Sequence, residues 1–124
     1  MGGRVWSDRN PALHGRLGDV LVVNRFRVSE HDVASFRARV EEAHALLAAC
    51  AGYVEGTVGR NVDQPDLWLL TTRWANVGSY RRALSSYDVK LGAWELLGTA
   101  LDEPSAYEVV EPGGELNEPL ARET

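Results

Sequence analysis

The segment from Leu67 to Trp74 would be apolar on both faces if it formed a β-strand. Successive side chains of a strand point to opposite faces. One face would carry Trp68, Leu70, Thr72 and Trp74, and the other Leu67, Leu69 and Thr71. A strand that is apolar on both faces has to be covered on both. The helices of so short a chain can cover only one side of a sheet, so we expect a second subunit, a ligand or both on the Trp side.

Length and charge restrict the class of protein. The 124 residues suffice for one domain with a single core. A formal net charge of -5, without a basic run that contains aromatic residues, argues against nucleic-acid binding. No apolar run approaches the roughly 20 residues that span a membrane, and the first residues lack the apolar stretch of a signal peptide. Cys50 is the single cysteine, so we expect a cytoplasmic protein without an intrachain disulfide.

The pattern along the chain predicts one folded domain at residues 19–111, between an N-terminal arm at 1–18 and an acidic C-terminal tail at 112–124. Helical spacing is clearest in the apolar stripe Val33, Phe36, Val40, Ala43, Leu47 and Cys50. The expected elements are a strand at 19–28, a helix from Ser29 to Gly52, strands at 53–60 and 67–74, helices at about 77–84 and 88–101, and a strand from Pro104. This β-α-β-β-α-β order predicts an α+β, ferredoxin-like split βαβ fold with a four-stranded antiparallel sheet.

Helices on one face of that sheet would leave the other face open. We assign to the open face Asn24 and Phe26 of the first strand, together with Trp68, Leu70 and Trp74 of the strand at 67–74. So large an apolar patch exceeds what soluble monomers usually expose. The sequence therefore predicts a homodimer in which two such faces meet and each encloses a small chamber.

At several of these residues the sequence resembles the antibiotic biosynthesis monooxygenase family, whose members are dimeric α/β barrels. The resemblance spans about residues 19–111 and rests on Asn24-Arg25-Phe26, on Trp74 and on the helix opening from Asn76 to Tyr80. In the branch of cofactor-independent, quinone-forming oxygenases, a Trp ends this strand and a Tyr follows six positions later, as Trp74 and Tyr80 do. That branch also has an Asn four positions before the Trp, where this chain has Leu70. Asn24 on the neighbouring strand could take its place.

The haem-degrading branch of the same family fits less well. It uses an Asn in the first strand, a Trp in the second helix and a His in the third. Asn24 matches the first position, but the other two fall near Ala83 and Ala93, so the axial haem ligand is missing. The resemblance therefore favours oxygenation without a cofactor over haem degradation.

The resemblance implies a homodimer that oxidises a hydrophobic, phenolic or polyketide-like small molecule with O2, as in antibiotic biosynthesis, using no cofactor and no metal. Such a substrate reduces O2 as its own anion, while the protein supplies orientation and hydrogen-bond donors. Asn24, Trp74 and Tyr80 are the candidate catalytic residues. The candidate substrate-binding residues are Val22, Phe26, Trp68, Leu70, Thr72, His44, Tyr87 and Trp94.

Packing alone also explains some of these residues. Tyr80 shares a helix face with its apolar neighbours, and His44 borders the stripe of the first helix. No general base is evident. Arg25 and Arg73 could lower the pKa of a bound phenol by their charge, but they alternate onto the face opposite Asn24. The three histidines lack metal-ligand spacing, and no Gly-rich phosphate loop follows a strand. Two alternatives stay open on the same barrel: a non-oxidative isomerase or cyclase, and a non-catalytic small-molecule-binding dimer.

Overall fold

The structure is a computed structural model that describes residues 19–116, so the predicted arm and the end of the predicted acidic tail lie outside the described residues. Its elements are β1 (Val20–Arg27), a 3₁₀ turn η1 (Glu30–Asp32), α2 (Val33–Ala48), β2 (Tyr53–Arg60), β3 (Leu67–Trp74), α3 (Val77–Ser85), α4 (Tyr87–Gly92), α5 (Trp94–Leu97) and β4 (Ala106–Glu108). None of the helices in this part of the chain is long and apolar enough to cross a membrane.

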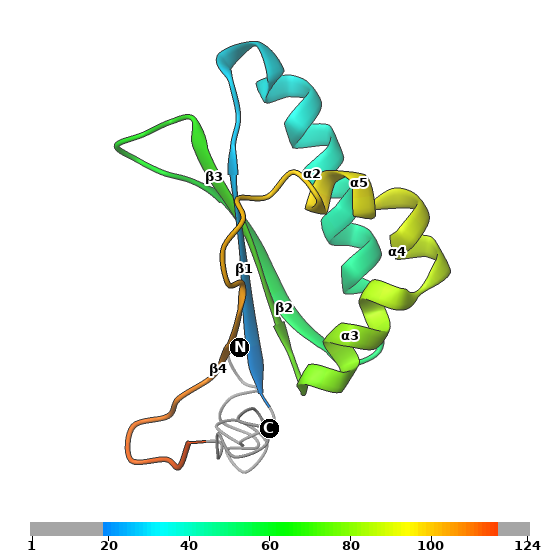
Figure 1. Ribbon diagram of the computed structural model, residues 1–124, viewed down its shortest axis with the longest axis vertical. Coiled ribbons are helices and arrows are strands. Elements are labelled where there is room, and N and C mark those ends of the chain that lie inside the picture. Colours follow the sequence, from blue (N-terminus) through cyan, green and yellow to red (C-terminus); the bar gives the residue numbers. More distant parts are fainter. Residues whose placement is uncertain (1–18, 117–124) are drawn as a thin grey trace, which may run out of the picture.

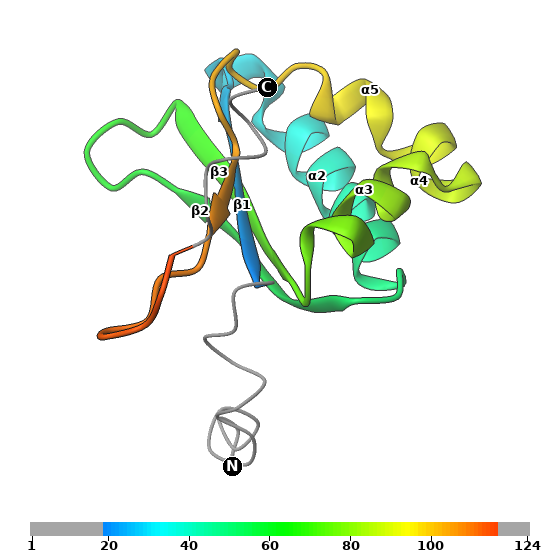
Figure 2. The same cartoon turned by 60° about the horizontal axis from the view of Figure 1, so that its bottom comes forward.

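The strands form one antiparallel sheet in the order β2-β3-β1-β4, and the helices lie together on one of its faces (Figures 1 and 2). This arrangement confirms the predicted ferredoxin-like fold. In the register of the two central strands, Val20 faces Trp74, Asn24 faces Leu70 and Phe26 faces Trp68. The predicted strand face therefore continues without a break from β3 to β1.

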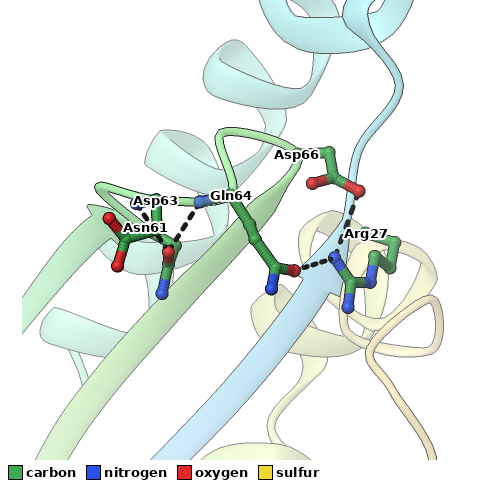
Figure 3. A network of polar contacts seen from close by, with 5 residues as sticks. All are labelled: Arg27, Asn61, Asp63, Gln64 and Asp66. Atoms are coloured by element: carbon green, nitrogen blue, oxygen red, sulfur yellow. Dashed lines mark hydrogen bonds and ion pairs between the residues drawn. The ribbon is translucent and has the colours of Figure 1, made fainter.

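Local sequence signals explain where the first half of the sheet turns. Helix α2 ends just before Gly52, whose backbone φ of 91° is open to glycine but unfavourable for other residues. The β2–β3 hairpin closes through Asn61, whose side-chain oxygen accepts the backbone N–H groups of Asp63 and Gln64. Figure 3 shows that Arg27 of β1 ties this turn down by donating to Gln64 and Asp66, both at 3.1 Å.

The prediction that the Trp face of the sheet is open is wrong. Trp74, Leu70 and Val22 are fully buried, and Phe26 and Trp68 are nearly so, within a single chain. The residues that cover this face include the apolar stripe of α2, of which Phe36, Val40, Ala43 and Leu47 are buried. The physical reason is that the opposite face carries Arg25, Arg27 and Arg73, so the Trp face is the more apolar of the two and the helices pack there.

The single predicted helix at 88–101 is two short helices, α4 and α5, in the structure. Ser86 caps α4, because its side chain accepts the N–H of Val89. The helix is interrupted at Ala93, whose φ of -129° and ψ of -25° are not helical, and α5 then ends at Leu97. The last strand is also shorter than predicted, since it begins at Ala106 instead of Pro104.

Gly52 also fixes where α3 docks, and its replacement tests this. A Cβ added at Gly52 would collide with the side chain of Ser79, which is buried on α3. We expect Gly52→Ala to lower the unfolding free energy by about 2 kcal/mol, because strained backbone and a clash act together. Gly113→Ala is the matched control: Gly113 also has positive φ, at 78°, but nothing lies within 4 Å of its added Cβ. Equal losses in urea denaturation would contradict the docking role.

Candidate active site

A line of ring contacts runs along the end of the sheet where β3 finishes at Trp74. The phenol of Tyr80 on α3 lies 5.8 Å, centroid to centroid, from the indole of Trp74. The same indole meets the ring of Tyr53 edge-on at 5.6 Å, since the hairpin register places Tyr53 directly opposite Trp74. Tyr53 in turn hydrogen-bonds His44 of α2, with 2.7 Å between the phenol oxygen and Nε2. The structure thus brings three elements together around Trp74.

Trp74 forms the buried centre of this ring cluster. Its side chain is 0% exposed, and its indole N–H donates to the hydroxyl of Thr72 at 2.8 Å. A buried donor that has a partner is favourable, whereas one without a partner is expensive. A substrate could take this N–H only if Thr72 gave way. Trp74 therefore serves first as a fixed surface against which Tyr80 packs.

Tyr80 is placed by the start of α3. Asn76 caps this helix, because its side-chain oxygen accepts the N–H of Ser79 at 2.7 Å. From there the half-buried Tyr80 packs on the core and forms a side-chain hydrogen bond with Ser105, just before β4. Burial raises the pKa of the Tyr80 phenol above its ordinary value, and the Ser105 hydrogen bond opposes that rise. The phenol accordingly stays protonated at neutral pH and can donate a hydrogen bond.

Asn24 lies on the same inner face of the sheet, between Val22 and Phe26 and opposite Leu70. Its side chain is only partly buried. No described residue hydrogen-bonds this amide, so it can accept or donate to a ligand. Among the predicted residues, Val22, Asn24, Leu70, Thr72, Trp74 and Tyr80 lie on or against one continuous stretch of this face.

Other predicted residues do not join this stretch. Phe26 and Trp68 pack on Phe36 at the opposite end of the sheet, with centroid distances of 5.2 Å from Phe26 and 5.4 Å from Trp68. The indole N–H of Trp68 is buried without a hydrogen-bond partner among the described residues. Tyr87 and Trp94 lie on α4 and α5 with 74% and 51% of their side chains exposed, and Trp94 donates to the Leu84 carbonyl.

Two residues of this region were absent from the sequence-based set. Tyr53 could have been found, because a hairpin turn at 61–66 pairs it with Trp74. Ser105 could not, because its contact with Tyr80 depends on the path of the chain after α5. His44, predicted as a substrate-binding residue, instead faces Tyr53, at a point where Gly56 leaves no space for a larger residue.

Arg25 and Arg73 lie on the outer face of the sheet, whereas Arg60 of β2 lies over the Trp68 ring on the inner face, at the end away from Trp74. Arg25 forms a two-point ion pair with Glu103, and Arg73 pairs with the buried Asp19 at 3.3 Å. The prediction that these arginines point away from Asn24 is confirmed. Among residues 19–116, no group of three or more His, Cys, Asp or Glu side chains could hold a metal ion. Around Tyr80 and Asn24 the inner face therefore offers neutral donors: an amide and hydroxyl groups.

A separate hollow of about 560 Å³ lies beside the β2–β3 hairpin. It is lined by Val28, Glu30, Val33, Arg60, Pro65 and Asp66. None of the predicted site residues lines it. Charges of both signs line this hollow, which distinguishes it from the neutral stretch of the inner face around Tyr80.

Comparison with known proteins agrees with this fold. The sequence model of the antibiotic biosynthesis monooxygenase family matches residues 19–92. A search of curated proteins gives no match. Among solved structures, SnoaB of Streptomyces nogalater, described as a cofactor-independent oxygenase, has a TM-score of 0.66 at 24% identity, covering 77% of this chain and 96% of its own.

Two further solved structures show the same fold at lower identity. A conserved protein of Methanosarcina mazei Go1 has a TM-score of 0.63 at 19% identity, covering 74% of this chain and 93% of its own. A conserved protein of unknown function from Bacteroides thetaiotaomicron has a TM-score of 0.65 at 12% identity, covering 76% of this chain and all of its own. At these identities the likeness concerns the fold.

Proposed function

Because this chain belongs to the antibiotic biosynthesis monooxygenase family, we propose that it oxidises a hydrophobic phenolic or polyketide-like molecule with O2 and without a bound cofactor. The observation that carries the proposal is Tyr80, a protonated phenol held against Trp74 and Ser105. The same sheet face bears the amide of Asn24, which has no hydrogen-bond partner among residues 19–116. The likeness in fold between this chain and SnoaB, a cofactor-independent oxygenase, supports the same reaction class.

The chemistry requires a substrate that can reduce O2 itself. An anthrone does so as its anion: the CH2 carbon becomes a carbonyl, one oxygen atom enters the product and the other leaves as water. The protein stabilises the negative charge on the substrate oxygen, and donors fixed in a water-poor site do this best. Tyr80 and Asn24 supply those donors, and Trp74 holds the Tyr80 ring in place. Val22 and Leu70, which are fully buried, form the apolar core beneath this part of the face.

Haem degradation finds little support at the corresponding positions. Ala83 and Ala93, which stand where the haem-degrading branch has its Trp and His, are both buried in the core. Neither has a side chain that can ligate iron. The residues present at these positions therefore do not fit a haem group.

We further propose that the protein acts in the cytoplasm as a homodimer, as members of the family typically are dimers that bind small molecules. The contact would use the outer face of the sheet, because the helices cover the inner face. Leu21, Val23, Leu67 and Leu69 alternate onto that outer face and remain partly exposed in the single chain. Sedimentation of the purified protein at micromolar concentration tests the dimer.

The reaction is tested by oxygen uptake with anthrone in metal-free buffer, with hydroquinone as a second substrate. We expect O2 to be consumed faster than in the uncatalysed reaction. One anthrone molecule should be oxidised, and one water formed, for each O2 consumed. Turnover of substrate under strict anaerobiosis would instead indicate an isomerase or cyclase. Recovery of the unchanged substrate after prolonged incubation in air would indicate a protein that binds without catalysis.

A further inference from the structure

The segment between α5 and β4, residues 98–105, runs along the edge of β1 (Figures 1 and 2). We call it the strap. Strand β4 has only three residues and pairs with Val20 to Val22, so within the described part of the chain the remainder of the β1 edge has no partner strand. Two isolated backbone hydrogen bonds replace it. Val23 N–H donates to the Ser105 carbonyl and Leu101 N–H to the Arg25 carbonyl, both at 2.7 Å.

Two side-chain contacts fasten the strap: the Tyr107 hydroxyl donates to the Pro104 carbonyl at 3.3 Å, and Arg25 pairs with Glu103. Glu103 accepts two hydrogen bonds from the Arg25 guanidinium, from Nε at 2.7 Å and from Nη2 at 2.8 Å. Two parallel bonds of this kind fix orientation as well as distance. Arg25 projects from the outer face of the sheet, so the strap is held from the side opposite Asn24. About a third of each side chain stays exposed, so this contact can open without unfolding the core.

The strap lies beside Tyr80 and Asn24, the two candidate donors of the inner face. Its last residue, Ser105, is the hydrogen-bond partner of Tyr80. Asn24, whose amide has no partner among the described residues, stands between Val23 and Arg25, the two residues that hold the strap through their backbone. A ligand that reaches both Tyr80 and Asn24 therefore has to displace or contact the strap.

We infer that the strap is a movable wall of the site, that Ser105 is one of the residues that contact substrate, and that the Arg25–Glu103 pair keeps the wall closed. Arg25 and Glu103 are positioning residues, because they act through Ser105 and Tyr80 from the outer face. The inference rests on the proposed function for the identity of the ligand. The closed and open states of the strap can be measured without any ligand.

The test compares Glu103→Gln with the wild type in amide hydrogen exchange and in nitration of tyrosines by tetranitromethane. Loss of the ion pair should speed exchange at Leu101 and Val23 by about two- to fivefold, as expected for an exposed pair that holds a local opening closed. Nitration of Tyr80, mapped by peptide mass, should rise by a similar factor. Tyr53, which lies on the far side of Trp74, should react at its original rate.

Asp66→Asn is the matched control, since it breaks the Arg27–Asp66 pair at 3.1 Å on the same sheet but away from the strap. It should change neither Leu101 exchange nor Tyr80 nitration. Arg25→Lys keeps the charge and loses the two-point geometry, so it should give an intermediate effect. Unchanged amide exchange in Glu103→Gln would refute the claim that the Arg25–Glu103 pair holds the strap closed. Faster exchange with unchanged nitration of Tyr80 would refute the claim that the strap is a wall of the site. A wild type that fails to oxidise anthrone would count against the proposed function alone.

Discussion

Trp74→Ala is expected to lower the free energy of unfolding by about 3–5 kcal/mol, which is typical of truncating a large buried aromatic residue. The side chain is fully buried and makes ring contacts with Tyr53 and Tyr80, so the substitution leaves a cavity between β3 and the helices. It also removes the donor to Thr72, whose hydroxyl is nearly inaccessible to water. Urea denaturation followed by far-ultraviolet circular dichroism measures the loss.

The control for this prediction is Trp94→Ala. Trp94 is half exposed on α5 and keeps one hydrogen bond, from its indole to the Leu84 carbonyl. Its loss should lower stability by about 1 kcal/mol, because little apolar area and one hydrogen bond are at stake. Similar losses in the two variants would show that Trp74 is not the centre of the core. Binding of an apolar dye to Trp74→Ala, but not to Trp94→Ala, would confirm that the cavity lies at the position of the Trp74 side chain.

The burial of Trp74 also shows what the sequence could and could not reveal. Strand β3 has the predicted bounds, and the stripe of α2 buries its predicted members from Phe36 to Leu47. Those signals are local, since periods of two and of 3.6 residues follow directly from backbone geometry. The choice of which sheet face the helices cover is not local. It depends on comparing the two faces over all strands.

The residues that distinguish the two faces are nevertheless present in the sequence. Counting only β3, both faces are apolar, and nothing separates Leu67 and Leu69 from Trp68 and Leu70. Strand β1 separates them, because Arg25 and Arg27 share the face of Leu69 and Leu67 in the register. Charged side chains are rarely buried unless they are paired. The face with arginines therefore faces outward, and the homodimer has to be argued from that face.

The site shows the same division between local and long-range information. Trp74 and Tyr80 lie six positions apart across a capped helix start, so their contact follows from local structure. The partner of Tyr80, Ser105, is brought by the strap and is 25 positions away in the chain. No periodic pattern marks such an irregular segment. Its position depends on the shortness of β4 and on the Arg25–Glu103 pair.

Tyr80→Phe should leave the fold intact and reduce kcat/KM for anthrone oxidation by about 100-fold, as expected when one donor to a developing oxyanion is removed. The ring and its contact with Trp74 remain, so only the hydroxyl and its hydrogen bond to Ser105 are lost. That loss should lower the unfolding free energy by no more than about 1 kcal/mol. Oxygen uptake and urea denaturation of the same preparation separate the two effects.

The pH dependence and a second tyrosine make this prediction specific. Burial raises the pKa of the Tyr80 phenol above its ordinary value of 10, so the hydroxyl remains a donor throughout the neutral range. The factor between wild type and Tyr80→Phe should therefore be constant from about pH 6 to pH 9. Tyr87→Phe removes the hydroxyl of an exposed residue on α4, away from the stretch around Tyr80, and should leave kcat/KM unchanged. Equal activities of Tyr80→Phe and wild type would exclude a role for the phenol in stabilising the substrate anion.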